Sequence, residues 1–431
     1  MATGRKWGSG SLRALAVEVV RRVTDEGAFS HAVLPALLER SRMKPMDREL
    51  ATELAYGTLR RLLPIDHALR SFLNKPLQDA PPRARAALRV GAYQLLYTRI
   101  PDHAAVSETV GLVSPSERGL VNAVLRRLAA EGVEWPTGVS AEAVSARVGL
   151  AAWAVRELRR HVGDDAEEAA AALANQAPLT LRTNPCRTSV DTLEARLRAG
   201  GHEPVRGRIH PASLRLRGGR PEALPGFGEG WFAVQDEASS WVVDVLDPQP
   251  GERVVDVCSA PGGKAADIAC RTGSVVAGDV SVQRIGRVAE TAARLGVRML
   301  LLAQDAARPA LRGGLDRVLV DAPCSGIGAA RRRPELLWRP QRSDLASLAR
   351  LQVRIAAGAA SLLRTGGVLV YSVCTFPSSE TEGVCTALLK RVPDLEPAPF
   401  RDPDGNEDFR ARLWPHRHGT DAMFVARFRR K

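Results

Sequence analysis

The sequence predicts a multidomain protein with an all-α N-terminal domain, a small α+β module and a C-terminal doubly wound α/β domain. Three observations lead to this prediction. Apolar residues recur at helical spacing early in the chain, β-branched residues alternate after about residue 177, and short apolar runs alternate with helical segments after about residue 234. The 431 residues suit three domains of about 150 residues. We expect these domains at residues 1–145, 146–233 and 234–431.

The N-terminal domain is predicted to be a bundle of helices. Leu12, Leu15 and Val19 lie on one helical face, and Pro82 marks a helix start, because proline suits the first turn but not the interior. Arginines recur on these apolar helices, where they would form either an RNA-facing surface or a solvated outer face. They are Arg60, Arg61, Arg83, Arg85, Arg89, Arg126 and Arg127.

The hydrophobic period changes in the middle of the chain. A second helical stretch at 141–175 precedes residues 179–184, whose alternation and closing Asn-Pro are typical of a strand and a turn. Strand-like segments at 214–217 and 231–234 would complete the small α+β module.

Strands and helices alternate in the C-terminal third. Short apolar runs separated by helical segments are typical of buried parallel strands with crossover helices. We expect helices at 282–295 and 344–363, and strands at 253–257, 275–279, 299–302, 317–321 and 368–372.

The chain is basic, with a formal net charge of +13 that comes mostly from arginine. Guanidinium groups suit bidentate phosphate contacts, so the charge favours a polyanionic partner, although a solvated basic surface would explain it too. Two clusters would either hold RNA phosphates or remain solvated. They are Arg331, Arg332 and Arg333, and the C-terminal Arg427, Arg429, Arg430 and Lys431.

The six cysteines are scattered, with no Cys-x-x-Cys and no zinc-ligand spacing, so we expect reduced thiols, no metal site and a cytoplasmic protein. Residues 1–10 lack the apolar core of a signal peptide, and no run of ~18 uncharged apolar residues occurs. We therefore expect neither export nor membrane insertion, and a monomer as the default state.

A glycine turn between a predicted strand and a predicted helix is the first candidate ligand site. Glycines permit close backbone approach, and the helix N-terminus offers free N–H groups to a carboxylate. The turn is neither Gly-x-Gly-x-x-Gly nor a phosphate-binding loop. We expect it to hold an anionic small molecule through Cys258, Ser259, Ala260, Pro261, Gly262, Gly263 and Lys264.

Acids follow the next two predicted strands. Asp279 can accept hydrogen bonds from both hydroxyls of an unphosphorylated ribose, and Asp305 can accept from an adenine amino group. Ligands of open α/β sheets bind outside the carboxyl ends of the strands, so the pattern favours an adenosyl group. Arg284 is a further candidate. The alternatives are helix caps or solvated loop residues for the acids, and a surface position for Arg284.

Two cysteines follow predicted strands on the same side of the sheet, Cys324 in Asp-Ala-Pro-Cys-Ser-Gly and Cys374 in Tyr-Ser-Val-Cys-Thr. Cytosine C5 is a poor nucleophile, but a thiolate added to C6 makes an enamine that can attack a methyl group from C5. The addition needs a thiol of lowered pKa and an acid near N3, for which Asp321 is the candidate. The residues alone leave either cysteine as the nucleophile. We expect Cys186, Cys270 and Cys385 to be inert, and Cys258 to serve packing or backbone contact in the turn.

The sequence resembles the Nol/Nop/Sun family of RNA cytosine-C5 methyltransferases. The motifs at 256–264, 321–326 with 331–338, and 371–375 occur in the family's order and spacing. Residues 49–60 and 121–127 resemble the NusB-like N-terminal domain of the bacterial Sun/Fmu type, which acts on 16S ribosomal RNA. The resemblance covers nearly the whole chain and implies a Rossmann-like catalytic domain.

The resemblance also implies roles for the candidate residues. It implies Cys374 as the C6 nucleophile and Cys324 as the thiol that assists product release, although DNA cytosine methyltransferases use the cysteine of their Pro-Cys motif. S-adenosylmethionine would be held by the turn at 258–264 and by Asp279, Arg284, Asp305 and Asp321. The partner would be 16S rRNA or a small-subunit assembly intermediate.

The chain departs from the family pattern at several positions. Val373 and Ala265 replace threonines, Ala422 replaces a glycine, and Glu380 keeps an acid to which we assign no role. None of these changes removes a reacting group.

Two other functions are alternatives to 16S rRNA methylation. One is a transfer-RNA cytosine-C5 methyltransferase, and the other is a non-catalytic RNA-binding assembly or antitermination factor; retention of both thiols speaks against the second.

Overall fold

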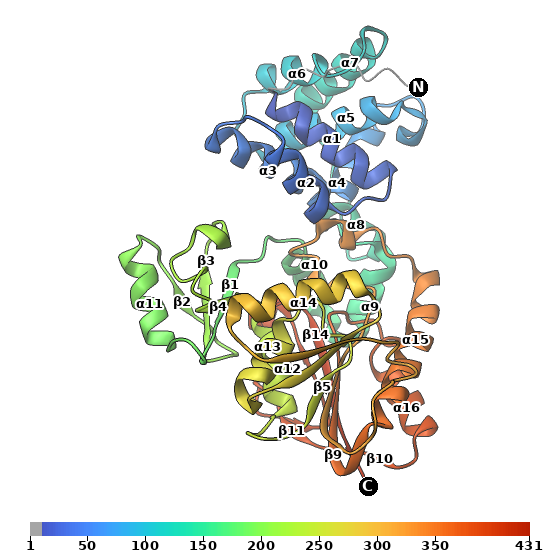
Figure 1. Cartoon of the computed structure of the whole chain (residues 1–431). Coiled ribbons are helices and arrows are strands. Elements are labelled where there is room, and N and C mark those ends of the chain that lie inside the picture. The colour runs from blue at the N-terminus through green and yellow to red at the C-terminus, as the bar shows by residue number, and fades with distance from the viewer. Residues whose placement is uncertain (1–10) are drawn as a thin grey trace, which may run out of the picture. The chain divides into compact units, whose positions relative to one another are not determined.

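The computed structural model describes residues 11–431, so the prediction of no export signal, which concerns residues 1–10, lies outside the described residues. The chain forms two compact units (Figure 1). The first runs to Asn175 and includes Ala330–Pro340, and the second contains Gln176–Ala329 and Gln341–Lys431. Within residues 11–431, no helix combines the length and the apolar character needed to cross a bilayer.

The first unit is entirely helical, as predicted for the N-terminal domain. Ser11 caps its first helix by accepting from the Ala14 N–H, and Ser114 forms a capping box with Glu117 before α7. The helices are α1 (Leu12–Asp25), α2 (Ser30–Glu39), α3 (Pro45–Arg60), α4 (Leu62–Arg70), η1 (Leu77–Asp79), α5 (Pro82–Tyr97), α6 (Asp102–Val110) and α7 (Pro115–Glu131).

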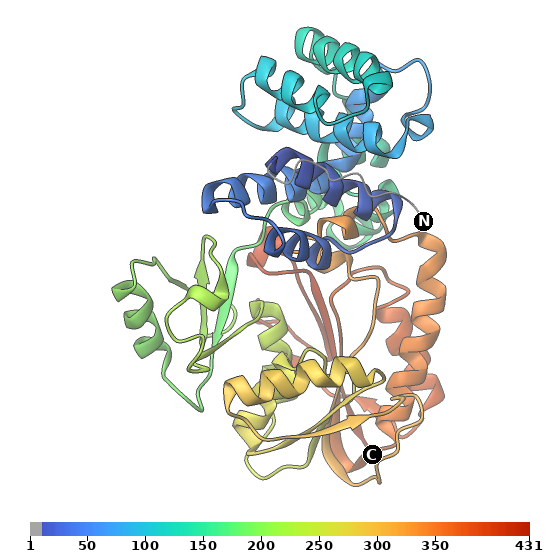
Figure 2. The same cartoon turned by 45° about the horizontal axis from the view of Figure 1, so that its top comes forward.

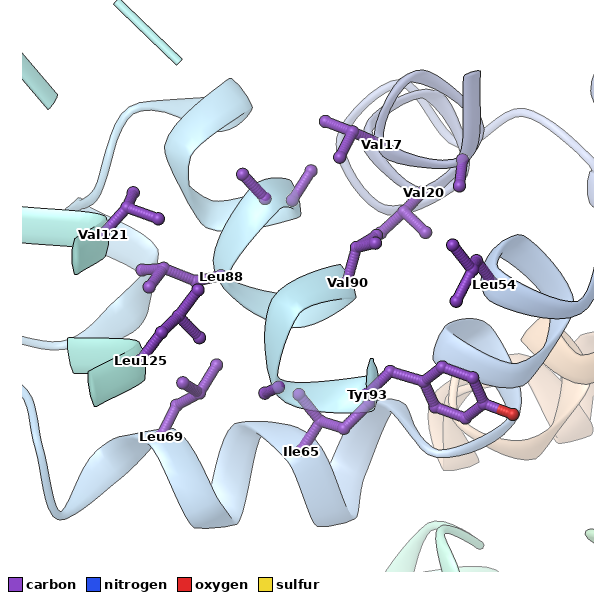
Figure 3. Packing of buried hydrophobic residues seen from close by; sticks show 14 of the residues in the cluster. Val17, Val20, Leu54, Ile65, Leu69, Leu88, Val90, Tyr93, Val121 and Leu125 are labelled. Carbon is purple, nitrogen blue, oxygen red and sulfur yellow. The ribbon is translucent and has the colours of Figure 1, made fainter. Parts of the chain in front are cut away.

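Helix α5 lies at the centre of the unit's core. Figure 3 shows Leu88 and Val90 of α5 between side chains of α1, α3, α4 and α7. Its neighbours bury most of α5, including the polar side chains of Arg89 and Gln94. Three further helices complete the unit: α8 (Ala141–Val148), α9 (Ala152–Val162) and α10 (Ala166–Leu173), the last two joined by η2 (Gly163–Asp165).

The segment Ala330–Pro340 packs in this helical unit although it lies far downstream in the sequence. Glu335, on η5 (Pro334–Leu337), is fully buried and accepts hydrogen bonds from the backbone N–H and the hydroxyl of Ser30, at 3.2 and 2.7 Å. The Trp338 indole donates to the Leu59 carbonyl at 2.9 Å. The segment is therefore anchored on the helices.

Most of the arginines considered for an RNA-facing or solvated surface donate within the unit. Arg89 pairs with Asp66 and is 6% exposed, and Arg85 pairs with Asp25. Arg60, Arg61 and Arg83 donate to the carbonyls of Arg331, Val148 and Leu112, respectively. Arg126 and Arg127 are exposed, and Arg331 is 9% exposed. The basic positions therefore stabilise the helical packing more than they form one surface.

The second unit begins with the predicted small α+β module. Its antiparallel sheet has the order β2-β3-β1-β4, with α11 beside it. The elements are β1 (Leu179–Thr183), α11 (Val190–Ala199), β2 (Val205–Arg206), β3 (Ser213–Leu216), η3 (Pro221–Ala223) and β4 (Phe232–Val234).

The larger sheet of this unit confirms the predicted α/β domain. Its order is β10-β14-β9-β8-β5-β6-β7, with β13 paired to β14, and neighbours from β9 to β7 are parallel. Its strands are β5 (Val254–Asp256), β6 (Val275–Asp279), β7 (Met299–Ala303), β8 (Leu315–Asp321), β9 (Leu363–Val373), β10 (Leu395–Pro397), β13 (Arg410–Leu413) and β14 (Met423–Arg430); β11 (Phe400–Arg401) and β12 (Glu407–Asp408) form a separate ribbon.

Helices cover both faces of the sheet, as Figure 2 shows. Neighbouring residues of β8 enter opposite cores: Val318 packs in the core that contains α15, and Leu319 packs in the core that contains α12 and α13. The helices are α12 (Glu237–Leu246), α13 (Gly263–Thr272), α14 (Val282–Leu295), η4 (Ile327–Ala329), α15 (Arg342–Ala360), α16 (Glu382–Arg391) and α17 (Pro415–His418).

The C-terminal basic residues belong to this sheet. The guanidinium of Arg427, on β14, donates to the carbonyls of Ala398 and Val245 at 3.1 and 3.4 Å. Arg430 donates to the Leu363 carbonyl at 2.7 Å. These two side chains therefore fasten an antiparallel edge that the sequence pattern did not predict.

The expectation that all six cysteines are reduced thiols is wrong for two of them, because Cys186 and Cys270 form a disulfide. Cys186 follows β1 and Cys270 lies on α13, and their Cα atoms are 5.8 Å apart. Asn184 holds the Cys186 loop in place by donating to the carbonyls of Gly230 and Leu295, each at 2.8 Å. The pair is 84 positions apart, so its proximity arises only from the packing of the small sheet on α13.

Arg182 of β1 makes a second link between the small sheet and α13. It is 1% exposed, donates from Nε to Gln235 at 2.8 Å and reaches the Gly263 carbonyl at 3.2 Å. It also pairs with Asp267 on α13 at 3.4 Å. The small module therefore helps to hold the beginning of α13.

Replacing Glu335 by alanine should destabilise the helical unit. The substitution leaves the N–H and hydroxyl of Ser30 buried without their acceptor, so the free energy of unfolding should fall by about 2 kcal/mol. Urea unfolding followed by tryptophan fluorescence measures this change. Glu142→Ala, which removes a surface partner of Arg156, is the control and should leave the unfolding midpoint unchanged. Equal midpoints for the two variants would contradict the prediction.

Candidate active site

The predicted glycine turn lies at the carboxyl end of β5 and leads into α13. Ser259 fixes it to the next strand, because both its N–H and its hydroxyl donate to the Gly278 carbonyl, at 2.8 and 3.0 Å. Gly262 has φ +104° and a Cβ there would meet Val288 of α14 at 3.3 Å, so the position favours glycine. The turn leaves the first N–H groups of α13 free of helical partners.

The strand order reverses beside this turn. The chain proceeds from β5 through β6 to β7 on one side, and β8 then pairs with the other side of β5. Ligands of doubly wound sheets bind at such a switch point, outside the carboxyl ends of the strands. The structure therefore brings the turn and the residues that follow β6, β7, β8 and β9 to one edge.

The acids predicted for the adenosyl group occupy neighbouring strand ends. Asp279 ends β6, is 2% exposed, accepts from the Ser281 N–H at 3.0 Å and pairs with Arg284 at 3.1 Å. Asp305 follows β7, is exposed and accepts from the Ala307 N–H at 2.9 Å. Each carboxylate retains free lone pairs for a ligand. Arg284 thus orients Asp279.

Asp321 ends β8 and receives one hydrogen bond on each carboxylate oxygen. Lys264 Nζ donates to Oδ2 at 2.7 Å, and the Ser372 hydroxyl, on β9, donates to Oδ1 at 2.8 Å. Burial opposes the charged form of Lys264, but the neighbouring Asp321 carboxylate outweighs it and raises the pKa of the lysine. A charged Lys264 therefore joins the turn to the end of β8.

Asp256, at the end of β5, is a fourth acid at this edge. It is 1% exposed, and burial, followed by the nearby Asp321 carboxylate, raises its pKa to about 7. Its Oδ1 accepts from the Cys258 N–H at 3.2 Å, whereas its Oδ2 is a buried acceptor without a hydrogen-bond partner among the described residues. The sequence predicts no separate role for Asp256, because a motif does not reveal that the side chain is buried.

The two candidate thiols lie together. Cys324, in the loop after β8, and Cys374, directly after β9, have their Sγ atoms 3.6 Å apart. The hydrogen bond from the Cys324 thiol lowers the pKa of Cys374 against burial, and the same bond, followed by burial, raises the pKa of Cys324. The two opposite pKa shifts therefore favour Cys374 over Cys324 as the thiol that loses its proton first.

The other free thiols are not activated. Burial, followed by the Asp256 carboxylate, raises the pKa of Cys258. Burial also raises the pKa of Cys385, to about 12. Reactivity follows the thiolate, so these environments make Cys258 and Cys385 poor nucleophiles.

The chain matches three family models. Residues 243–429 match the model described as 16S rRNA methyltransferase RsmB/F, residues 11–130 match the NusB family, and residues 150–221 match a ferredoxin-like domain of RsmF/B-like methyltransferases. These matches fall on the α/β domain, the helical unit and the region that contains α9, α10 and the small sheet.

Similar proteins extend over most of the chain. The ribosomal RNA small subunit methyltransferase B of Citrobacter koseri is 35% identical over 89% of this chain and 91% of its own length. The Escherichia coli (strain K12) protein of that name is 34% identical over 90% of this chain and 91% of its own. The crystal structure of PH0851 has a TM-score of 0.83 at 25% identity, covering 99% of this chain and 100% of that one.

Iodoacetamide should alkylate Cys374 faster than the other three free thiols near neutral pH, because only the Cys374 pKa is lowered. Peptide mass mapping after short exposure identifies the labelled residue. Cys374→Ala should abolish the fast phase, whereas Cys385→Ala should retain it. Fast labelling of Cys324 would overturn this assignment.

Asp256→Asn should stabilise the protein more at alkaline than at acidic pH. A carboxyl whose pKa rises on folding binds its proton more tightly in the folded state, so its contribution to stability falls between about pH 4 and pH 7. The variant removes that loss. Its melting temperature should exceed the wild-type value at about pH 8 by more than at about pH 5. An equal difference at both pH values would contradict the raised pKa.

Proposed function

Because this chain belongs to the ribosomal RNA small subunit methyltransferase B family, we propose that it methylates C5 of a cytosine in 16S rRNA with S-adenosylmethionine as methyl donor. The reaction would proceed through a covalent bond between Cys374 and cytosine C6. The family membership supports methyl transfer to RNA, and the thiol geometry supports the choice of position on the base.

The observation that carries this proposal is the thiol pair. Two cysteines with opposite pKa shifts lie 3.6 Å apart at the switch point of the sheet, beside an acid–lysine pair and the glycine turn. Methyl transfer to an oxygen or an exocyclic nitrogen needs no thiolate, whereas methylation at C5 does, because this carbon must first be made nucleophilic. The paired thiols therefore favour C5.

The residues at the turn suit S-adenosylmethionine. The free N–H groups at the start of α13 suit its carboxylate, and the buried Oδ2 of Asp256 is an acceptor for its ammonium group. Asp279 can accept from both ribose hydroxyls, and Asp305 from the adenine amino group. When bound, the sulfonium supplies an electrophilic methyl group. We keep Cys258–Lys264, Asp279, Arg284, Asp305 and Asp321 as the proposed binding set.

Cys374 opens the reaction. Its thiolate adds to C6, the C5–C6 double bond breaks, and electron density moves to C5 and towards N3. We assign Asp321 to the N3 edge of the cytosine, where its carboxyl group would donate a proton to N3 as electron density reaches the ring nitrogen; Lys264, with Nζ 2.7 Å from Oδ2, would stabilise the carboxylate that this transfer leaves. C5 is then nucleophilic enough to take the methyl group.

Product release needs transfer of the C5 proton to solvent water and departure of Cys374: the electron pair of the C5–H bond re-forms the C5–C6 double bond, and the pair of the C6–S bond leaves with the sulfur. As the C6–S bond breaks, negative charge returns to the Cys374 sulfur, and the Cys324 thiol at 3.6 Å is placed to donate a hydrogen bond to it. Cys324 therefore assists release, and its raised pKa keeps the required proton on the sulfur.

We assign RNA binding to the N-terminal domain of residues 1–145, which lies within the helical unit. The target base would enter the α/β domain of residues 234–431 as a flipped or single-stranded nucleotide, because C5 and C6 are stacked inside a duplex. Residues 146–233 would link these domains. The RNA would be 16S rRNA or a small-subunit assembly intermediate, bound by a monomer.

A denaturing gel after incubation with S-adenosylmethionine and unmodified 16S rRNA tests the covalent step. Cys324→Ala should accumulate a protein–RNA band, because release is slowed, and Cys374→Ala should form none and lose methyl transfer by at least about 1000-fold. Cys385→Ala is the matched control and should behave as wild type, since its sulfur lies outside the thiol pair.

Other outcomes of the gel are equally informative. A band that persists in Cys374→Ala and disappears in Cys324→Ala would exchange the two roles. Methyl transfer to transfer RNA instead of 16S rRNA would keep the chemistry and replace the substrate. Tight rRNA binding by the wild-type protein without transfer to any cytosine would overturn the enzymatic proposal.

A further inference from the structure

Glu380 is a buried carboxylate that the proposed reaction does not use. It lies between β9 and α16, is 0% exposed and accepts three hydrogen bonds from side chain and backbone donors. The Ser325 N–H donates to Oε1 at 2.9 Å, the Ser325 hydroxyl to Oε2 at 2.5 Å, and Gln352 Nε2 to Oε1 at 2.9 Å. Burying a carboxylate is costly, and these donors offset the cost.

The network holds the Cys324 loop on both sides of the cysteine. Ser325 follows Cys324 and is bound to Glu380 through two atoms. Pro323 precedes Cys324, and its carbonyl accepts from Gln352 Nε2 at 2.9 Å, the same nitrogen that donates to Glu380. The backbone on each side of Cys324 therefore depends on the Glu380–Gln352 pair.

The same network reaches the strand that carries Cys374. The Tyr371 hydroxyl, three positions before Cys374, donates to the Glu380 carbonyl at 2.7 Å. The hydroxyls of Ser325 and Thr375 are 2.7 Å apart, and Thr375 follows Cys374. One buried acid thus connects the neighbours of both thiols.

A backbone contact reinforces this arrangement. The Gly328 N–H donates to the Cys374 carbonyl at 3.0 Å, and the Ala422 N–H donates to the Gly328 carbonyl at 3.0 Å. A Cβ at Gly328 would lie 2.1 Å from the Ala422 carbonyl oxygen, so only glycine permits this approach. The loop after β8 is therefore packed tightly against the end of β9.

We infer that Glu380 is a positioning residue that fixes the Cys324 thiol within hydrogen-bond distance of Cys374. The inference rests on the proposed function for its catalytic consequence, but the contacts concern the free protein. Glu380 acts through its hydrogen bonds to Ser325 and Gln352 and makes no hydrogen bond to either sulfur, although its charge adds to the raised pKa of Cys324.

The spacing matters because the Cys324 hydrogen bond is the largest influence on Cys374. That bond lowers the pKa of Cys374, burial opposes it, and the charged groups that act on Cys374 are Asp321 and Asp421, which raise the pKa, and Lys264, which lowers it. If the Cys324 loop relaxes, the lowering bond is lost while burial and both carboxylates remain. The thiolate of Cys374 then becomes less populated at neutral pH.

Glu380→Gln tests the inference while keeping the shape of the side chain. With its amide NH2 at the Oε2 position, the new side chain reverses the bond to the Ser325 hydroxyl, and the bonds from the Ser325 N–H and Gln352 lose the strengthening that the carboxylate charge gives them. Near neutral pH, the rate of Cys374 alkylation by iodoacetamide should fall about ten-fold and its pH profile should move to higher pH. The kcat for methyl transfer should fall by a similar factor, with KM for S-adenosylmethionine unchanged.

Companion variants separate positioning from folding. Ser325→Ala removes only the hydroxyl and should shift the alkylation profile in the same direction by a smaller amount, because the Ser325 N–H bond remains. Glu380→Asp, which keeps the charge, should recover part of the lost rate. Glu382→Gln is the matched control: this nearby acid pairs with Arg412, and its loss should leave the alkylation profile unchanged.

The outcomes distinguish this inference from the proposed function. An unchanged alkylation profile in both Glu380→Gln and Ser325→Ala would overturn the positioning role, whatever the methyl-transfer result. A profile shifted equally by Glu382→Gln would also overturn it. A shift specific to Glu380 and Ser325 in a protein that methylates no cytosine would uphold the positioning role and reject the proposed reaction.

Discussion

Lys264 and Asp321 form an ion pair across the point where the strand order of the large sheet reverses, and the remaining site residues are arranged around it. Lys264 lies on α13 after the glycine turn, whereas Asp321 ends β8. Ser372 of β9 donates to the other oxygen of Asp321. One contact of 2.7 Å thus links the proposed cofactor turn to the strand ends that carry the thiols.

The surroundings of the two thiols shift their pKa values in opposite directions. Both are partly buried, and desolvation alone would raise the pKa of each. The proton of the hydrogen bond between the sulfur atoms breaks the symmetry, because this bond lowers the pKa of Cys374 and raises the pKa of Cys324. The buried acid network around Glu380 therefore matters through geometry: it keeps the two strand ends close enough for that proton to be shared.

The net charge of the chain says less about its function than the sequence motifs do. A net charge of +13 favours a polyanionic partner, yet several arginines on the helices and on β14 donate to carbonyls or pair with carboxylates inside their own unit. A guanidinium has five donors and can satisfy backbone carbonyls as readily as phosphates. The net charge treats all arginines alike, whereas the packing shows that some are bound within their own unit and others are exposed to solvent.

Sequence alone determined the domain classes, the parallel strands, the glycine turn and the two candidate cysteines, because hydrophobic period and motif spacing are local properties. Tertiary structure decided the contacts between distant segments. It paired Cys186 with Cys270, buried Asp256, added the antiparallel edge at β14 and placed Glu380 between the thiol loops. Such contacts depend on where the crossovers bring each strand end, and no spacing along the chain encodes the distance between two side chains on different strands.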